Sequence, residues 1–242
     1  MHILKKIFTA TTGYWIHKKS TLPIGADLYM DIHNRIKYGP LTTMFDIGAN
    51  LGQTWEWFRN NEASAKIFCF EPVAETFEVL KNKTTKDKNC VTENIAFGNI
   101  AGEKMIKLFG SEHSALNSLK EELMNNELNS KKEIIYIDTL DHYCSQKGIP
   151  TIDFLKIDTE GYEMNVLEGA TKMLSEAKIS FIYCEIGFLK KNNRNTNFAD
   201  LSEWLAAHDY YFYGLYQLVT NGWKDGDYFG NALYVHKDIF QP

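Results

Sequence analysis

Five carboxylates stand where apolar runs of the sequence end. Asp46 follows "TTMF", Glu71 follows "FCF", Asp158 and Glu160 follow "FLKI", and Glu185 follows "IYC". Carboxylates accept hydrogen bonds from hydroxyl groups, attract cations, and act as bases when burial or like charges raise their pKa. Such a set is costly at one rim unless a cation, a hydroxyl group or a metal ion engages it. The pattern therefore indicates a binding or catalytic site.

The stretch "DIGANLG", from Asp46 to Gly52, joins the first apolar run to a segment of helical period. Glycine lets the backbone turn sharply and approach a ligand closely. A phosphate-binding loop would end in Gly-Lys-Ser/Thr, which is missing. The dinucleotide pattern GxGxxG also fails, because Asn50 occupies its second glycine and the third is displaced. Asp46 would repel a diphosphate and attract a cation, so an NAD-dependent enzyme is disfavoured.

The second run ends at Glu71, some 25 residues after Asp46, and Pro72 then opens a helix. A carboxylate at this point in a βαβ unit can accept both hydroxyls of a ribose. Asn94 and Ala96, at the end of the third run, could border a purine ring. The three features together ask for a ribose, an adenine and a positive centre without phosphate. S-adenosylmethionine meets these demands.

Strand-length apolar runs alternate with helical segments, a pattern typical of a parallel sheet with crossover helices. After the last helix, Tyr210–Val219 and Gly230–Phe240 predict an antiparallel pair at the sheet edge, and their aromatic residues are read mainly as core. The charged segment Lys120–Glu133 is read as a surface helix or loop. The predicted strands are Thr43–Ile47, Lys66–Phe70, Val91–Ala96, Lys104–Phe109, Ile134–Ile137, Phe154–Ile157 and Ser180–Glu185; the predicted helices are Gln53–Asn60, Ala74–Lys83, Thr139–Gln146, Met164–Leu174 and Phe198–His208.

Candidates for a general base come from two segments. Asp158 and Glu160 end an apolar strand, and a helix begins near Glu163, which is read as a helix-terminal charge favoured by the macrodipole. His113 lies in the loop "FGSEHSALNSL" and has an intrinsic pKa near neutrality, although an exposed loop histidine explains it equally well. The order of preference is Asp158, Glu160, His113.

The motifs "FDIGANLGQT", "FCFEP", "NIAFGN", "FLKIDTEGYEMNVLEGA" and "IYCEI", in this order, resemble the FkbM-type family of S-adenosylmethionine-dependent methyltransferases. The resemblance implies an α/β, Rossmann-like class I methyltransferase fold: a seven-stranded, mostly parallel sheet with an antiparallel edge strand and helices on both faces. It places Asp46, Gly48 and Asn50 near the methionine part, Glu71 on the ribose, Asn94 and Ala96 near the adenine, and Asp158 at the ammonium or the reacting hydroxyl. The full set expected to bind the cofactor is Asp46, Gly48, Ala49, Asn50, Gly52, Glu71, Pro72, Asn94, Ala96 and Asp158.

The function implied by the resemblance is O-methylation of a hydroxyl on a sugar, a glycan or a related natural product. Two alternatives stay open. In the first, Asp158, Glu160 and Glu185 hold Mg²⁺, which acidifies the acceptor hydroxyl; this is not favoured, and no metal ligand is assigned. In the second, the chain is a non-catalytic module that binds S-adenosylmethionine.

The length, charge and cysteine content of the chain limit its domain number, its partners and its location. The 242 residues suit one large domain at 41–242 with an N-terminal helical extension at 1–40, and the net charge of −5 gives no general attraction to nucleic acid. Cys69, Cys90, Cys144 and Cys184 form no metal-binding pattern, so free thiols and a cytoplasmic location are predicted. The segment "MHILKKIFTATTGYWIHKK" is read as a packed helix or mobile arm, in preference to contact with the inner face of a membrane. The oligomeric state is not predicted.

Overall fold

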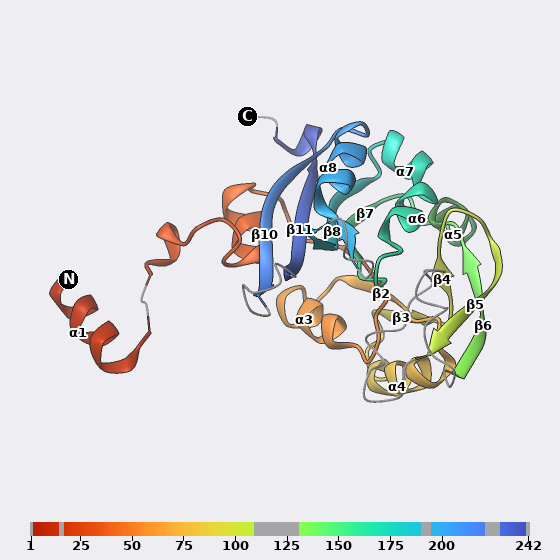
Figure 1. The fold of residues 1–242 in the computed structure, drawn as a ribbon, viewed down its shortest axis with the longest axis horizontal. Helices are drawn as coiled ribbons and strands as arrows, with labels where there is room; N and C mark the ends of the chain where they lie inside the picture. Colours follow the sequence, from red (N-terminus) through yellow and green to blue (C-terminus); the bar gives the residue numbers. More distant parts are fainter. Residues whose placement is uncertain (1, 15–16, 109–130, 190–194, 221–227, 241–242) are drawn as a thin grey trace.

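The computed structural model describes residues 2–14, 17–108, 131–189, 195–220 and 228–240. Its centre is a twisted sheet with the strand order β10-β11-β8-β7-β1-β2-β3, and the short strand β9 pairs with β8 (Figure 1). The strands are β1 Thr43–Ile47, β2 Lys66–Phe70, β3 Cys90–Glu93, β7 Ile152–Ile157, β8 Ile179–Gly187, β9 Thr196–Asn197, β10 Tyr210–Thr220 and β11 Tyr228–His236.

The pairing directions confirm the predicted fold class. Strands β3, β2, β1, β7 and β8 run parallel to one another. Strand β11 runs antiparallel to both β8 and β10. The predicted hairpin therefore lies at the sheet edge, but its antiparallel strand is one place inside that edge, and β10 is the outermost strand.

A second, three-stranded sheet corrects the prediction of one strand over Val91–Ala96. Its order is β4-β6-β5, with β4 Ala96–Phe97, β5 Gly102–Leu108 and β6 Lys131–Asp138. Strand β3 ends at Glu93 because the next side chain, Asn94, turns aside and donates to the carbonyls of Glu71 and Pro72. Residues 131–133 belong to β6, so the surface helix or loop predicted there is wrong, and 120–130 lie outside the described residues.

Helices cover both faces of the large sheet, as predicted. Phe45 and Ile47 of β1 pack with side chains of α5, α6, α7 and α8 on one face. Met44 packs on the opposite face with side chains of α2, η2, α3 and α4. The four cysteines are free in this structure. The bounds are α2 Leu28–Met30, η2 Asp31–Arg35, α3 Gln53–Asn61, α4 Ala74–Thr84, α5 Leu140–Lys147, α6 Glu163–Glu168, α7 Thr171–Ser175 and α8 Phe198–Ala206.

The single helix predicted over Met164–Leu174 is wrong, since the chain forms α6 and then α7. The break falls at Gly169, where an added Cβ would lie 2.1 Å from the carbonyl oxygen of Gly98. No side chain fits between two backbones this close. The break therefore lets the loop that begins at Gly98, just after β4, pack tightly against the end of α6.

The N-terminal region has two parts. Helix α1 (His2–Thr12) lies apart from the sheet and its covering helices (Figure 1), and a short turn η1 (Lys19–Thr21) follows. By contrast, Leu28, Tyr29 and Ile32 pack into the core beside α3. The boundary at residue 40 stays a prediction. The chain ends with a turn, η5 (Lys237–Phe240). Within the described part, no helix is long and apolar enough to cross a membrane.

Candidate active site

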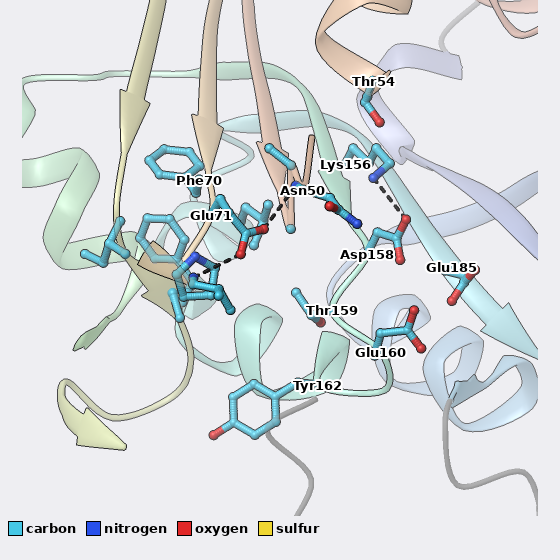
Figure 2. Close-up of a pocket in the computed structure, with 18 of the residues that line it drawn as sticks. Asn50, Thr54, Phe70, Glu71, Lys156, Asp158, Thr159, Glu160, Tyr162 and Glu185 are labelled. Atoms are coloured by element: carbon cyan, nitrogen blue, oxygen red, sulfur yellow. Dashed lines mark hydrogen bonds and ion pairs between the residues drawn. The ribbon is translucent and has the colours of Figure 1, made fainter. Parts of the chain in front are cut away.

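The carboxyl ends of β1, β2, β7 and β8 surround a cavity of about 500 Å³. In an open α/β sheet, ligands bind outside the carboxyl ends of the strands, where neighbouring connections leave in opposite directions. That divergence occurs here between β1 and β7, which pair directly. A cavity of this size accommodates a nucleoside-sized ligand. Figure 2 shows one carboxylate on one side of the space and a group of three on the other.

The loop after β1 forms the floor of the cavity. Gly48 has φ +81°, and an added Cβ would lie 1.9 Å from the carbonyl oxygen of Asp158. The N–H groups of Gly48 and Ala49 donate to the carbonyl of Phe70 at 3.1 and 3.0 Å. Asn50 is also left-handed, with φ 46°, a conformation that Asn tolerates better than most residues. Glycine at 48 thus allows this turn to pack directly on the loop after β7.

Glu71, at the end of β2, is 7% exposed and held by two backbone hydrogen bonds. Its carboxylate oxygens accept from the N–H groups of Asn50 and Val73, both at 3.0 Å (Figure 2). Burial raises the pKa of Glu71 to about 7, and these two hydrogen bonds oppose the rise. Each oxygen keeps a second lone pair, so the carboxylate can still accept hydroxyl groups of a ligand.

The wall beside Glu71 is apolar. Phe70, Val73, Ile95, Ala96 and Phe97 line the cavity here, and all five come from the ends of β2 and β4 and their flanking loops. Flat and branched side chains of this kind suit one face of an aromatic ring system. The β2 side of the cavity therefore combines a hydroxyl acceptor with an apolar surface.

Lys156, in the middle of the sheet, links two of the carboxylates. Its ammonium donates to Asp46 Oδ1 and to Asp158 Oδ2, each at 3.2 Å. Burial by itself lowers the pKa of Lys156, but Asp158 and Asp46 outweigh it and raise the pKa above the ordinary value. Asp46 is fully buried, which raises its pKa although Lys156 opposes this. Its Oδ2 has no hydrogen-bond partner among the described residues.

Three carboxylates face one another across from Glu71. One oxygen each from Asp158, Glu160 and Glu185 lies within 4.8 Å of the others. The pKa of Glu185 rises to about 9, first through burial and then through repulsion by Asp158 and Glu160. The side-chain amide of Asn195 donates to Glu185 at 2.6 Å and fixes its orientation. This group of three can hold a cation, share a proton or accept one from a hydroxyl.

A fourth carboxylate, Glu163, shapes the loop that presents Glu160. Glu163 is fully buried and accepts from the N–H groups of Thr159 and Gly161 at 2.9 and 3.1 Å. Glu160 between them has φ 53°, an uncommon value for a non-glycine residue. Such strain persists only where the surroundings enforce it, often at functional sites. Glu163 begins α6, yet it also acts as the internal support of this loop, beyond the helix-terminal charge that the sequence suggested.

The predicted site residues fall into three groups. His113 lies outside the described residues. Asp46, Gly52 and Asn94 do not line the cavity: Asp46 lies behind Lys156, and Asn94 braces the loop after β2. The remaining ones line it together: Gly48, Ala49, Asn50, Glu71, Pro72, Ala96, Asp158 and Glu160. The roles assigned to them stay predictions.

Sequence reasoning gave no role to several residues that the fold brings to the cavity. Lys156 is the clearest, and its signal was available: a charge inside the apolar run "FLKI" must be paired if both faces of the strand are buried. Tyr162 also lines the cavity. Phe229 lines it too, and it belongs to the aromatic residues of the hairpin that could stack against a sugar but were read mainly as core. Nothing in the local sequence sets Phe229 apart from the neighbouring aromatic residues.

The order β3-β2-β1-β7-β8 with an antiparallel β11 beyond it, together with a cavity at the ends of the central strands, defines the class I methyltransferase type of α/β fold. Residues 46–212 match the family model described as the methyltransferase FkbM domain. The chain belongs to the FkbM methyltransferase family, which confirms the resemblance drawn from its motifs. No curated protein matches the sequence.

Solved structures similar to this chain include three methyltransferases. The precorrin-6y C5,15-methyltransferase of Geobacter metallireducens is 11% identical over 89% of this chain and 90% of its own, with a TM-score of 0.46. The 1,6-didemethyltoxoflavin-N1-methyltransferase of Burkholderia thailandensis is 10% identical over 98% and 88%, with a TM-score of 0.47. A TehB-like methyltransferase of Corynebacterium glutamicum is 10% identical over 98% and 96%, with a TM-score of 0.41. At this level, the likenesses carry no inference about substrate.

Proposed function

We propose that this chain is an S-adenosylmethionine-dependent O-methyltransferase that acts on a hydroxyl of a sugar, a glycan or a related natural product. Family membership supports methyl transfer, and the acceptor class follows from the resemblance of the motifs to the family. The observation that carries the cofactor assignment is Glu71, a buried carboxylate with free lone pairs beside an apolar wall. Ribose hydroxyls would bind the carboxylate and adenine would lie on the wall.

The opposite end of the cavity suits the cationic part of the ligand. Asp158, Glu160 and Glu185 place negative charge where an ammonium or sulfonium would be stabilised. Asp46, behind Lys156, adds a buried carboxylate to the same end without lining the cavity. A phosphate-bearing ligand would meet repulsion here. The residues present therefore fit S-adenosylmethionine better than a dinucleotide.

When bound, S-adenosylmethionine would supply a methyl group on a positively charged sulfur, and the methyl–sulfur bond would break to leave S-adenosylhomocysteine. The chain's own contribution is to hold an acceptor hydroxyl in line with that group, an effect worth several kcal/mol. Asp158 or Glu160 then accepts the hydroxyl proton as the oxygen gains its new bond. A base matters because an alcohol loses its proton reluctantly. Glu160 is held at the cavity by the strained loop, and Asp158 is oriented by Lys156.

Calorimetry with S-adenosylmethionine and S-adenosylhomocysteine tests the cofactor assignment. Glu71→Ala should weaken both affinities by about a hundredfold or more, because two hydrogen bonds to a charged group are lost. Glu78→Ala is the matched control, since Glu78 is an exposed carboxylate on the neighbouring helix α4. Equal affinity of Glu71→Ala and the wild type would remove the ribose assignment.

Acceptor screening tests catalysis itself. The wild type is incubated with S-adenosylmethionine and a panel of sugars, glycans and phenolic natural products, and formation of S-adenosylhomocysteine is measured. With an active acceptor, the variant that removes the base, Asp158→Asn or Glu160→Gln, should lower kcat by about 10²–10⁴. Tight cofactor binding without turnover on any acceptor would favour the non-catalytic module.

A specific observation also favours a metal-assisted variant of the same reaction. The carboxylate oxygens of Asp158, Glu160 and Glu185 lie close enough together to bind one cation, and Mg²⁺ prefers oxygen ligands. A metal ion there would bind the acceptor hydroxyl and lower its pKa.

Exhaustive EDTA treatment separates the two mechanisms. Under the metal-assisted mechanism, activity disappears with EDTA and returns with Mg²⁺, and Glu185→Gln needs more Mg²⁺ for the same rate. Activity that survives EDTA leaves the direct carboxylate base. A thermal-shift titration of the cofactor-free protein with Mg²⁺ gives a second readout that does not depend on finding the acceptor.

A further inference from the structure

The charge of the chain is divided unevenly between its N-terminal segment and the rest. Residues 1–26 contain four lysines (Lys5, Lys6, Lys18 and Lys19) and no Asp or Glu. The whole chain has 26 basic and 31 acidic residues, so residues 27–242 keep 22 basic against 31 acidic, a net charge of −9. A segment of charge +4 is therefore attached to a strongly acidic domain.

Helix α1 within this segment has two distinct sides. At 100° per residue, the positions of Ile3, Leu4, Ile7, Phe8 and Ala10 fall on one side, with one polar residue, Thr11, among them. The positions of Lys5, Lys6, His2, Thr9 and Thr12 fall on the other. Amphipathic helices of this kind, with cationic polar faces and Phe or Leu on the apolar face, lie in the plane of a membrane surface.

Helix α1 lies apart from the rest of the described chain, and its described aromatic residue is exposed. Figure 1 shows α1 well away from the sheet and its covering helices. Phe8 is 41% exposed and Tyr14 just beyond the helix is 72% exposed. An isolated helix of 11 residues is marginal in water, so burial of its apolar side on a surface would stabilise it.

We propose that residues 2–14 and the lysines at 18 and 19 bind the surface of a bilayer that contains anionic lipids. The apolar side of α1 enters the boundary between head groups and acyl chains, and Tyr14 adds an aromatic anchor at the head-group level. Lys5, Lys6, Lys18 and Lys19 provide the attraction to anionic head groups. The acidic domain is repelled by the same surface, so contact is limited to the N-terminal segment.

The proposal is independent of methyl transfer and follows from charge and helix geometry alone. Each lysine near an anionic surface strengthens binding by about fivefold, and this attraction falls as salt shortens the Debye length. Reversing two of the four charges should therefore weaken binding by about 25-fold or more. Loss of the Phe8 ring should weaken it as well, because binding scales with the apolar area that enters the interface.

The experiment measures cosedimentation of the full chain with vesicles. One set is phosphatidylcholine alone, and the other contains about one third phosphatidylglycerol. We expect binding to the anionic vesicles only, and loss of binding in high salt. The double variant Lys5→Glu/Lys6→Glu and the single variant Phe8→Ser should both lose binding. Lys86→Glu/Lys88→Glu is the matched control, because it makes the same charge change at two exposed lysines of the domain and should bind like the wild type.

Each other outcome would overturn the proposal. These are equal binding of Lys5→Glu/Lys6→Glu and the wild type, equal binding to both vesicle types, and no binding at all. Unfolding midpoints of all variants are compared first, and α1 lies apart from the core, so none should change.

Sedimentation velocity of the wild type and Phe8→Ser without lipid adds an independent readout. A dimer that Phe8→Ser dissociates, without vesicle binding, would assign the apolar side to a second copy instead. Hydrogen exchange should show protection of residues 2–12 on anionic vesicles only.

Discussion

At one end of the cavity a single carboxylate, Glu71, is held by two backbone N–H groups, whereas at the other end Asp158, Glu160 and Glu185 lie together near the ammonium of Lys156. The first end is satisfied by the fold itself and needs no counter-charge. At the second end, burial and the neighbouring carboxylates raise the pKa of Glu185 to about 9, so binding of a proton or a cation is favoured there. The difference indicates that the backbone preforms the Glu71 end, whereas the Asp158 end responds to protonation or to an added cation.

The largest effect should come from removing Lys156. Lys156→Met leaves the buried Asp46 carboxylate without its partner, and such uncompensated charges typically cost about 3–5 kcal/mol of unfolding free energy. Urea unfolding measures the loss. Lys237→Met is the matched control: Lys237 also pairs with an aspartate, Asp209, at 2.8 Å, but at the exposed surface. The control should leave the unfolding midpoint unchanged. Equal losses in the two variants would show that burial at Asp46 does not set the cost.

Lys156 also shows which parts of the site can be predicted from the sequence and which cannot. Apolar runs that end in polar residues predicted the glycine-rich turn after β1, the position of Glu71, and the pair Asp158 and Glu160. These features are predictable because the period of a strand and the place where it ends are local properties of the sequence. Lys156 was passed over because its partners are 110 and 2 residues away, and pairing across the sheet depends on the register of β1 and β7. Gly169 is similar, since only the approach of Gly98 explains the break between α6 and α7. Local sequence patterns therefore do not predict which distant backbone segments come into contact.

The next effect concerns the pH dependence of stability at the end that carries Asp158, Glu160 and Glu185. The pKa of Glu185 is about 9 in the folded protein and about 4.5 when unfolded, so the folded state keeps a proton that the unfolded chain releases in this window. Stability therefore falls as pH rises from about 4.5 to 9. Glu185→Gln cannot ionise and should be more stable than the wild type at about pH 9, on the order of 3 kcal/mol, because the shift is shared among coupled carboxylates.

Unfolding curves of the wild type and Glu185→Gln across pH test this difference between the two ends. The gain should shrink to near zero well below pH 4.5, where Glu185 is protonated in both states. Glu71 and the buried cysteines also lower stability as pH rises, in the wild type and in Glu185→Gln alike. The part of the fall that is missing in Glu185→Gln therefore belongs to the Glu185 end. A gain that does not depend on pH would mean that the substitution acts through packing or through Asn195 instead.

A smaller effect tests the preformed end through its backbone. Gly48→Ala introduces both the strain of φ +81° and a contact with the Asp158 carbonyl, so a loss of at least about 2 kcal/mol is expected. Gly148→Ala separates the two causes, because Gly148 also has a positive φ, +63°, but has nothing near its Cβ position. That control should cost about 1–2 kcal/mol. Unfolding free energies that agree between the two would place the whole effect in φ, and the contact between the loops after β1 and β7 would have no energetic role.

The smallest effect concerns Asn94, which supports Glu71 without touching the cavity. Its amide donates to the carbonyls of Glu71 and Pro72, both at 2.8 Å, so Asn94→Ala should cost about 1–2 kcal/mol in unfolding free energy. Because these bonds fix the segment that carries Glu71, affinity for S-adenosylhomocysteine should also fall by several fold in calorimetry. Asn61→Ala removes a comparable amide–carbonyl bond, to Trp57, at an exposed helix end and should leave affinity unchanged. If Asn94→Ala lowers stability but not affinity, Glu71 is positioned by the N–H groups of Asn50 and Val73 alone, and the preformed end is rigid without its outer support.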